Sequence, residues 1–325
     1  MFIELLIAAV SISTVFLFGC VGEIIMEKSG HLNLGIPGIM CFGTAGGCFG
    51  ASLCVHAAGG GQPAWILIVL VSVFFALVFG AMLGSIYAFL TVTLNCNQNI
   101  TGLAITTFGV GLTQFLMDNL IDRSTFFVAS PIMKAKLEFA DKLDWFGDLF
   151  LNYGILVYLA IAIAIATHIV LKKTRIGLNL RAIGENPATA DAAGINVSKY
   201  KYFAVLTGSG VAGLGGYFYI IDYIGGSWEN ASTIEALGWL SIALVIFTLW
   251  RPILSIFGSI IFAAFYIIAF RLAGYVSGLT FTDTAVLKLL PYIITIIVLI
   301  ITSIFGSKNV QPPASLGLPY FREDR

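Results

Sequence analysis

Few side chains in this sequence are of the types that carry out acid–base or covalent chemistry. The three histidines, His31, His56 and His168, are far apart in the chain, so no local pair of them is available to bind a metal ion or share a proton. The phosphate-binding pattern G-x-x-x-x-G-K-[ST] does not occur, and neither does any Gly-Lys pair. We therefore expect a non-catalytic chain that holds no metal and binds no cofactor itself.

Side-chain amides form the clearest polar cluster. Asn95, Asn97, Gln98 and Asn99 interrupt a long apolar run, and Thr101 follows them. An unpaired amide in apolar surroundings costs several kcal/mol, so these groups must face protein, water or a bound molecule. An amide both donates and accepts, as a nucleobase or a ribose hydroxyl requires. Hydrogen bonding between helices is the alternative explanation.

The composition indicates which elements position these groups. Hydrophobic residues make up 58% of the 325 residues and charged residues 10%, and the mean hydropathy is +0.96. A soluble domain has about 25% charged residues, so this chain has too few charges for a water-exposed surface. Basic and acidic residues both number 17, which gives no basic excess for nucleic acid. We predict an all-α, polytopic membrane protein.

Long uncharged runs mark the expected spans, because about 20 apolar residues cross a bilayer as a helix. The amide cluster divides the longest run in two, which gives nine candidate segments and a prediction of about eight or nine transmembrane helices. One or more of them is expected to be broken or re-entrant, above all at Gly35-Ile36-Pro37-Gly38. The runs are Leu5–Gly22, Leu32–Ala58, Trp65–Met117, Tyr153–Leu171, Tyr202–Ile221, Ala236–Trp250, Ile253–Phe270 and Leu289–Phe305.

Two further features of these runs give structural expectations. Gly43/Gly47 and Gly46/Gly50 have the small-xxx-small spacing of closely packed membrane helices. The uncharged stretch Trp65–Leu94 would form about 45 Å of helix, so it must tilt, kink near Gly80 or Gly84, or extend beyond the bilayer.

The distribution of lysine and arginine predicts the orientation. The densest basic segment is 172–201, which places this loop in the cytoplasm. Counting spans outward from it puts the N-terminus outside, the loop 118–152 outside and the C-terminus in the cytoplasm. Glu23 and Asp222 fall near the ends of spans, as do His31 and His168, and we expect all four to be interfacial. A carrier driven by protons would be expected to bury such a group in mid-span.

The basic loop contains the signature of a short helix. Asn186 is a good N-cap, Pro187 suits the first helical position, 188–193 favours helix, and Gly194 suits the left-handed residue after the end. A helix this short is barely stable on its own in water. Membrane helices or another protein must therefore hold it in place. Either a simple turn or a docking helix for a soluble partner would have this pattern.

Several sequence blocks bear on whether the short helix is a simple turn or a docking helix. Together they resemble permeases of ABC importers, in the superfamily that handles branched-chain amino acids, ribose and nucleosides. They run in order along nearly the whole chain, with departures from the usual pattern at Pro37 and at Thr248-Leu249. The matching blocks are Glu27–Met40, Asn97–Ala104, Thr174–Gly216, Gly238–Phe247, Trp250-Arg251-Pro252 and Pro313–Tyr320.

Within the superfamily, the chain looks most like the smaller permease of a nucleoside or simple-sugar importer. The resemblance implies a permease (transmembrane) domain over 1–306 with the coupling loop 172–201, and a cytoplasmic tail over 307–325. It also implies a path for a nucleoside that opens by alternating access. A simple sugar or a branched-chain amino acid is the alternative substrate, and a self-sufficient carrier or channel is the alternative class.

The resemblance further implies partners and site residues. The partners are an ABC ATPase that carries ATP and Mg²⁺, a second and paralogous permease, an extracellular substrate-binding lipoprotein and the bilayer of a bacterial cytoplasmic (inner) membrane. The residues expected to couple to the ATPase are Gly184, Glu185, Asn186, Pro187, Ala190, Asp191, Ala192 and Gly194. The residues predicted for the substrate path are Asn33, Asn97, Gln98, Asn99, Thr101, Phe108 and Trp239.

Overall fold

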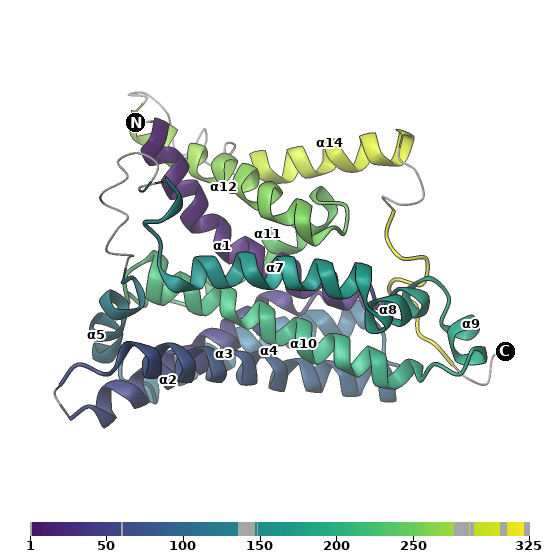
Figure 1. Ribbon diagram of the computed structural model, residues 1–325, viewed down its shortest axis with the longest axis horizontal. Coiled ribbons are helices and arrows are strands. Elements are labelled where there is room, and N and C mark those ends of the chain that lie inside the picture. Colours follow the sequence, from purple (N-terminus) through teal and green to yellow (C-terminus); the bar gives the residue numbers. More distant parts are fainter. Residues whose placement is uncertain are drawn as a thin grey trace.

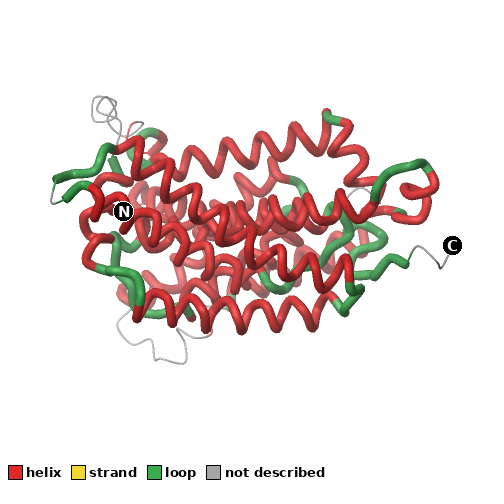
Figure 2. The backbone as a smooth tube through the Cα atoms, turned by 90° about the horizontal axis from the view of Figure 1, so that it is seen from below, coloured by secondary structure: helices red, strands yellow, loops and turns green. Residues whose placement is uncertain are grey.

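The chain folds into a bundle of helices whose long members run along one axis (Figure 1 and Figure 2). The computed structural model describes residues 2–59, 61–135, 147, 149–275, 286, 289–305 and 311–321. Within these ranges every regular element is helical and there is no strand, as the composition predicts.

Each predicted apolar segment contains a long helix. Six helices are long and apolar enough to cross a membrane: α1, α2, α3 with η1, α4, α7, and α10 with η3. By that measure six of the predicted spans are confirmed. The bounds are α1 (Phe2–Glu27), α2 (Ile36–Ala57), α3 (Trp65–Ala88), η1 (Phe89–Thr93), α4 (Gln98–Asn119), α5 (Ser124–Met133), α7 (Ile155–Lys173), α8 (Arg175–Glu185), α9 (Pro187–Ala192), α10 (Val197–Phe218), η3 (Tyr219–Tyr223), α11 (Ser232–Phe247), α12 (Pro252–Tyr275) and α14 (Leu290–Phe305).

The two irregularities expected inside predicted spans lie at helix ends in the structure, at the start of α2 and at the end of the segment from Trp65. The chain leaves the helical conformation between Glu27 and Ile36, with Gly30 at a φ of +86°, and Pro37 lies in the first turn of α2. The long segment from Trp65 stays helical through Gly80 and Gly84 and ends in the π-helical turn η1.

Helix α10 is the centre of the bundle, because α1, α2 and α3 all pack against it. The approach is close enough that a methyl group on Gly43 would overlap Gly213, and one on Gly22 would overlap the Gly208 carbonyl. The two small-residue motifs of α2 serve different neighbours. Gly43 and Gly47 face α10, whereas Gly46 and Gly50 face α3. The packing predicted from their spacing is confirmed.

The outer surface of the bundle is apolar, as a lipid-facing surface must be. Leu70 of α3, Phe257 of α12 and Ile304 of α14 are all exposed. In water such a surface would drive aggregation. The protein is therefore embedded in a membrane.

The two ends of the bundle differ in content. The N-terminus and α5 lie at one end, and α8, α9 and the C-terminus lie at the other (Figure 1). We call the second end the inner end. Residues 311–321 fold back there against α8 and the α1–α2 connection, since Ser315 N donates to Gly184 O and Gly317 N to Gly30 O. The division of the chain at residue 307 stays a prediction.

The glycine contacts predict a contrast between two Gly→Ala variants. Gly43→Ala should destabilise the protein by about 1–3 kcal/mol, because the new methyl group overlaps α10. Gly111→Ala should be neutral or stabilising by up to about 1 kcal/mol, because nothing lies within 4 Å of that position and alanine favours helix. Thermal unfolding of the two purified variants in detergent measures the difference. Equal stability would contradict the packing at α10.

Candidate functional site

The predicted short helix is present at the inner end. Thr174 caps α8 by accepting a hydrogen bond from Gly177 N at 3.2 Å, and Asn186 caps α9 by accepting one from Thr189 N at 3.0 Å. Pro187 is the first residue of α9, and Gly194 follows its end with a φ of +81°. The local prediction over 186–194 is therefore confirmed at Asn186, Pro187 and Gly194, and the helix ends at Ala192, one residue before the predicted end.

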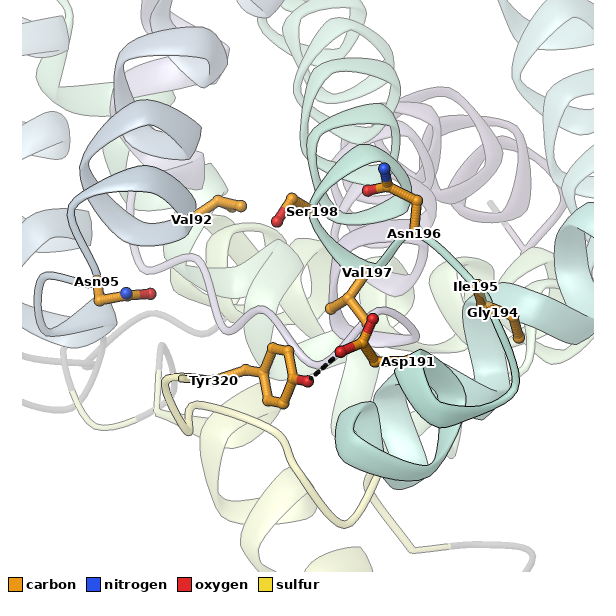
Figure 3. A pocket seen from close by; sticks show the side chains of 9 residues that line it. All are labelled: Val92, Asn95, Asp191, Gly194, Ile195, Asn196, Val197, Ser198 and Tyr320. Carbon is orange, nitrogen blue, oxygen red and sulfur yellow. Dashed lines mark hydrogen bonds between the residues drawn. The ribbon is translucent and has the colours of Figure 1, made fainter. Parts of the chain in front are cut away.

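Helix α9 is held by its neighbours on one side. Ala190 packs in a small apolar cluster with Ile183 of α8 and Val197 of α10. The Tyr320 hydroxyl donates to Asp191 Oδ2 at 2.9 Å (Figure 3). The short helix is thus anchored to two membrane-linked helices and to the C-terminal segment, as a helix of this length requires.

The other side of this segment is open to solvent. Ala188, Thr189, Ala192 and Ala193 are exposed on or beside α9, and all four have small side chains. Between α9, the start of α10 and the end of η1 lies a cavity of about 540 Å³ (Figure 3). Its lining includes Asp191, Gly194, Asn196 and Asn95. The exposed side of α9 therefore carries small side chains and lies beside a cavity whose lining is partly polar.

The expected coupling residues divide between these two sides. Glu185, Asn186, Ala192 and Gly194 are exposed, and Pro187 and Asp191 are half-buried. Gly184 and Ala190 are buried and support the segment from within. The structure thus brings all eight residues into one segment, and their coupling role stays a prediction.

Three of the predicted pathway residues make hydrogen bonds within the protein. Asn33 is fully buried, and its Oδ1 accepts from Gly35 N at 2.9 Å. Gln98 Oε1 accepts from Leu32 N at 2.9 Å, while its Nε2 donates to Leu318 O at 3.5 Å. Asn97 caps α4 by accepting from Ile100 N. Gln98 thus links segments that are far apart in the chain, as the inter-helix alternative requires, whereas the Oδ1 bonds of Asn33 and Asn97 are local.

The remaining predicted pathway residues lie on two helices. Thr101 is buried on α4, Asn99 and Phe108 are exposed on that helix, and Trp239 is half-buried on α11. Phe108 belongs to an exposed stripe on α4 that also contains Leu103, Thr107, Gly111 and Phe115. Contact between these residues and a substrate stays a prediction.

From the sequence, we expected Glu23, Asp222 and His31 to lie at the membrane interface, where water can reach their side chains. This expectation was wrong for all three. Glu23 and His31 are fully buried, and Asp222 is 7% exposed. The cause is close packing at both ends of the bundle. Glu23 accepts from Asn33 N at 2.9 Å, and the π-helical turn η3 carries Asp222 inward. The burial of these three residues could not be predicted from their sequence positions, because each lies within a few residues of a helix end, where exposure to water is expected.

Two further inner-end features have no clear signal in the sequence. The first is the buried pair formed by the Trp250 indole, which donates to the Glu27 carboxylate. The second is the docking of Ser315 on Gly184, where the Ser315 hydroxyl donates to the carbonyl at 2.5 Å. Both join segments more than 100 residues apart, so periodicity cannot reveal them.

Comparison with known proteins decides the family. Residues 5–301 match the permease component of branched-chain amino acid transport systems. The chain belongs to this family. This permease is 31% identical to the nucleoside ABC transporter permease protein NupC of Lactococcus lactis, over 95% of this chain and 94% of NupC. It is a multi-pass membrane subunit of an ABC transporter, in a family of non-catalytic transport components.

Two other relatives cover nearly all of this permease. The putative glucose ABC transporter permease protein TsgC13 of Haloferax volcanii is 30% identical over 98% of each chain. The guanosine ABC transporter permease protein NupQ of Bacillus subtilis is 29% identical over 94% of this chain and 92% of NupQ. The three relatives share the transporter class, and the substrates in their names differ.

Burial of His31 predicts a pH dependence of stability. Burial holds the pKa of His31 well below its usual range, and Lys201 acts in the same direction. The unfolded chain therefore takes up a proton near pH 6.5 that the folded chain does not. Stability should be full above that pH and fall below it, by up to about 1.4 kcal/mol per pH unit.

The variant His31→Phe keeps a ring and cannot take up the proton, so its stability should vary less between pH 7.5 and pH 5.5 than that of the parent. The control is His56→Phe, because His56 is exposed. Thermal unfolding at several pH values gives both profiles. Parallel profiles for His31→Phe and the parent would refute the assignment.

Proposed function

We propose that this chain is one of two permease subunits of an ATP-driven importer of nucleosides. The observation that carries the proposal is α9, a capped helix with an exposed face of small residues that the inner end of the bundle holds from behind. A separate ATPase subunit, which binds ATP and Mg²⁺, docks on α9. The permease itself carries out no covalent step and binds no cofactor.

The coupling is mechanical in this proposal. Closure of the ATPase moves α9, and the contacts of Ala190 with Ile183 and Val197 transmit the movement to α8 and α10. Since α10 is packed at glycine positions against α1, α2 and α3, a shift of α10 repositions those helices as well. Such coupling requires that nucleotide and substrate pathway bias the same two states.

Charge supports the orientation. Lys172, Lys173, Arg175 and Arg181 all lie in α7 and α8 at the inner end, and Arg251 lies in the turn before α12. The positive-inside rule then puts this end in the cytoplasm, where ATP is available. The opposite end, with α5 and the N-terminus, faces outward toward a substrate-binding lipoprotein. The protein resides in the bacterial cytoplasmic membrane.

The substrate path of the proposal follows the exposed face of α4. Phe108 offers a flat ring, and Thr107 offers a hydroxyl on the same face. A second and paralogous permease would complete the path from the other side, as the resemblance to two-permease nucleoside systems implies. The names of NupC and NupQ support a nucleoside, and that of TsgC13 supports a simple sugar as the second candidate.

The docking role of α9 predicts the effect of a bulky substitution. Ala192→Trp places a large ring on the exposed face of α9, so it should reduce co-purification of the ATPase with tagged permease by about tenfold or more. Ala64→Trp is the matched control, because Ala64 is also exposed but lies at the other end of the bundle. Both variants should insert into the membrane normally. Full ATPase recovery with Ala192→Trp, or uptake by the permease reconstituted alone, would overturn the proposal.

The substrate assignment predicts the outcome of competition. Uptake of a radiolabelled nucleoside by cells that express the whole transporter should be inhibited by other nucleosides, and not by ribose, glucose or leucine at the same concentration. A neutral path with hydroxyls and aromatic rings can hydrogen-bond and stack a nucleobase. Stronger inhibition by glucose would transfer the assignment to the simple-sugar class.

A further inference from the structure

A second cavity at the inner end has no part in the proposed transport cycle. It measures about 470 Å³ and lies where the end of α7, helix α8, the end of α1 and the α11–α12 turn meet. Five basic side chains line it, and we call it the inner basic pocket. They are Lys28, His168, Lys172, Arg181 and Arg251.

The charge of the inner basic pocket is not neutralised from within. Its lining includes no aspartate or glutamate. Lys28, Lys172, Arg181 and Arg251 form no ion pair within the part of the chain that the structure describes. The Glu27 carboxylate accepts from the Trp250 indole and is 3% exposed, and it is not part of the lining. Burial lowers the pKa of Lys28; Glu185 and Glu27 partly offset this effect, and Arg181 and Arg251 add to it.

The turn that brings Arg251 to the pocket is strained. Leu249 and Trp250 have φ values of +55° and +53°, a left-handed conformation that is unfavourable for residues other than glycine. The Trp250 N–H donates to Val245 O at 3.2 Å, and its indole donates to Glu27. Strain that the surrounding structure maintains is typical of sites that hold a ligand or take part in a mechanism.

The pocket also has an apolar side that continues toward lipid. Leu171 and the Trp250 ring line it together with the charged groups. Helices α7 and α12 pack against each other, and next to the pocket they expose Ile169 and Leu254. Basic groups beside an exposed apolar surface at the end of membrane helices match the two halves of a phospholipid, the phosphate and the acyl chains.

We propose that the inner basic pocket binds the phosphate of an anionic phospholipid from the surrounding leaflet. Arg181 and Arg251 supply planar guanidinium groups for the phosphate oxygens, and Lys28 and Lys172 supply ammonium groups. The acyl chains lie along the exposed faces of α7 and α12. The bound lipid would neutralise repulsion among these side chains and brace α8, which carries the docking helix α9.

Binding of short-chain lipids to the complete purified transporter tests the proposal. Native mass spectrometry would compare dioctanoyl phosphatidylglycerol with dioctanoyl phosphatidylcholine, whose trimethylammonium group the pocket should repel. We expect phosphatidylglycerol to bind at least about tenfold more tightly. Equal affinity for the two lipids would overturn the proposal. Inorganic phosphate is the third probe, and if it bound as tightly as phosphatidylglycerol the site would belong to a soluble anion.

Matched double variants locate the site. Lys28→Gln with Arg251→Gln should weaken phosphatidylglycerol binding by about 30-fold, because each basic residue at a lipid surface contributes roughly a fivefold increase in binding. Lys173→Gln with Arg175→Gln removes the same charge from exposed positions outside the pocket and should change binding by less than about threefold. An equal loss in both double variants would show a diffuse charge effect and refute the pocket. No ATP or substrate is present, so the result is independent of the proposed transport function.

Discussion

The close contact of α10 with α1, α2 and α3 is the constraint on which the rest of the structure depends. In a membrane, burial of apolar area gives little drive for one helix to pack on another, so association relies on van der Waals contact between closely spaced backbones. Gly22 with Gly208 and Gly43 with Gly213 allow that spacing. Because four helices share these contacts, α10 cannot shift far without taking its neighbours with it.

In the proposed mechanism, the inner end connects this packed core to a surface for another protein. Helix α9 is too short to be stable alone, yet it is held in place by an apolar cluster, by the cap at Asn186 and by the hydrogen bond from Tyr320. The same residues that stabilise α9 also connect it to α8 and α10. In the proposed mechanism, the contacts that stabilise α9 would therefore also transmit its movement to α8 and α10. The inner basic pocket lies on the other side of α8, where lipid would act on the same element.

Local features of this protein were predictable from sequence, and long-range features were not. The α9 boundaries follow from Asn186, Pro187 and Gly194, because caps depend on residues within one turn. The positions of the membrane helices were also predictable, because each long apolar run lies within one continuous stretch of the sequence. The burial of Glu23 and the satisfaction of Gln98 by Leu32 and Leu318 depend on segments that meet only after folding. An amide cluster looks the same in a sequence whether it contacts substrate or holds helices together.

The docking of residues 311–321 has a consequence for biogenesis. Tyr320 reaches Asp191 across 129 positions, and Ser315 reaches Gly184 across 131. While the ribosome is still inserting α11 and α12, the segment that steadies α9 has not yet been translated. A half-made chain in the translocon therefore presents a loosely held α9, and only a fully synthesised one offers the finished surface. If the ATPase docks on α9 as proposed, the order of synthesis would delay that docking until α11 and α12 have been inserted into the bilayer.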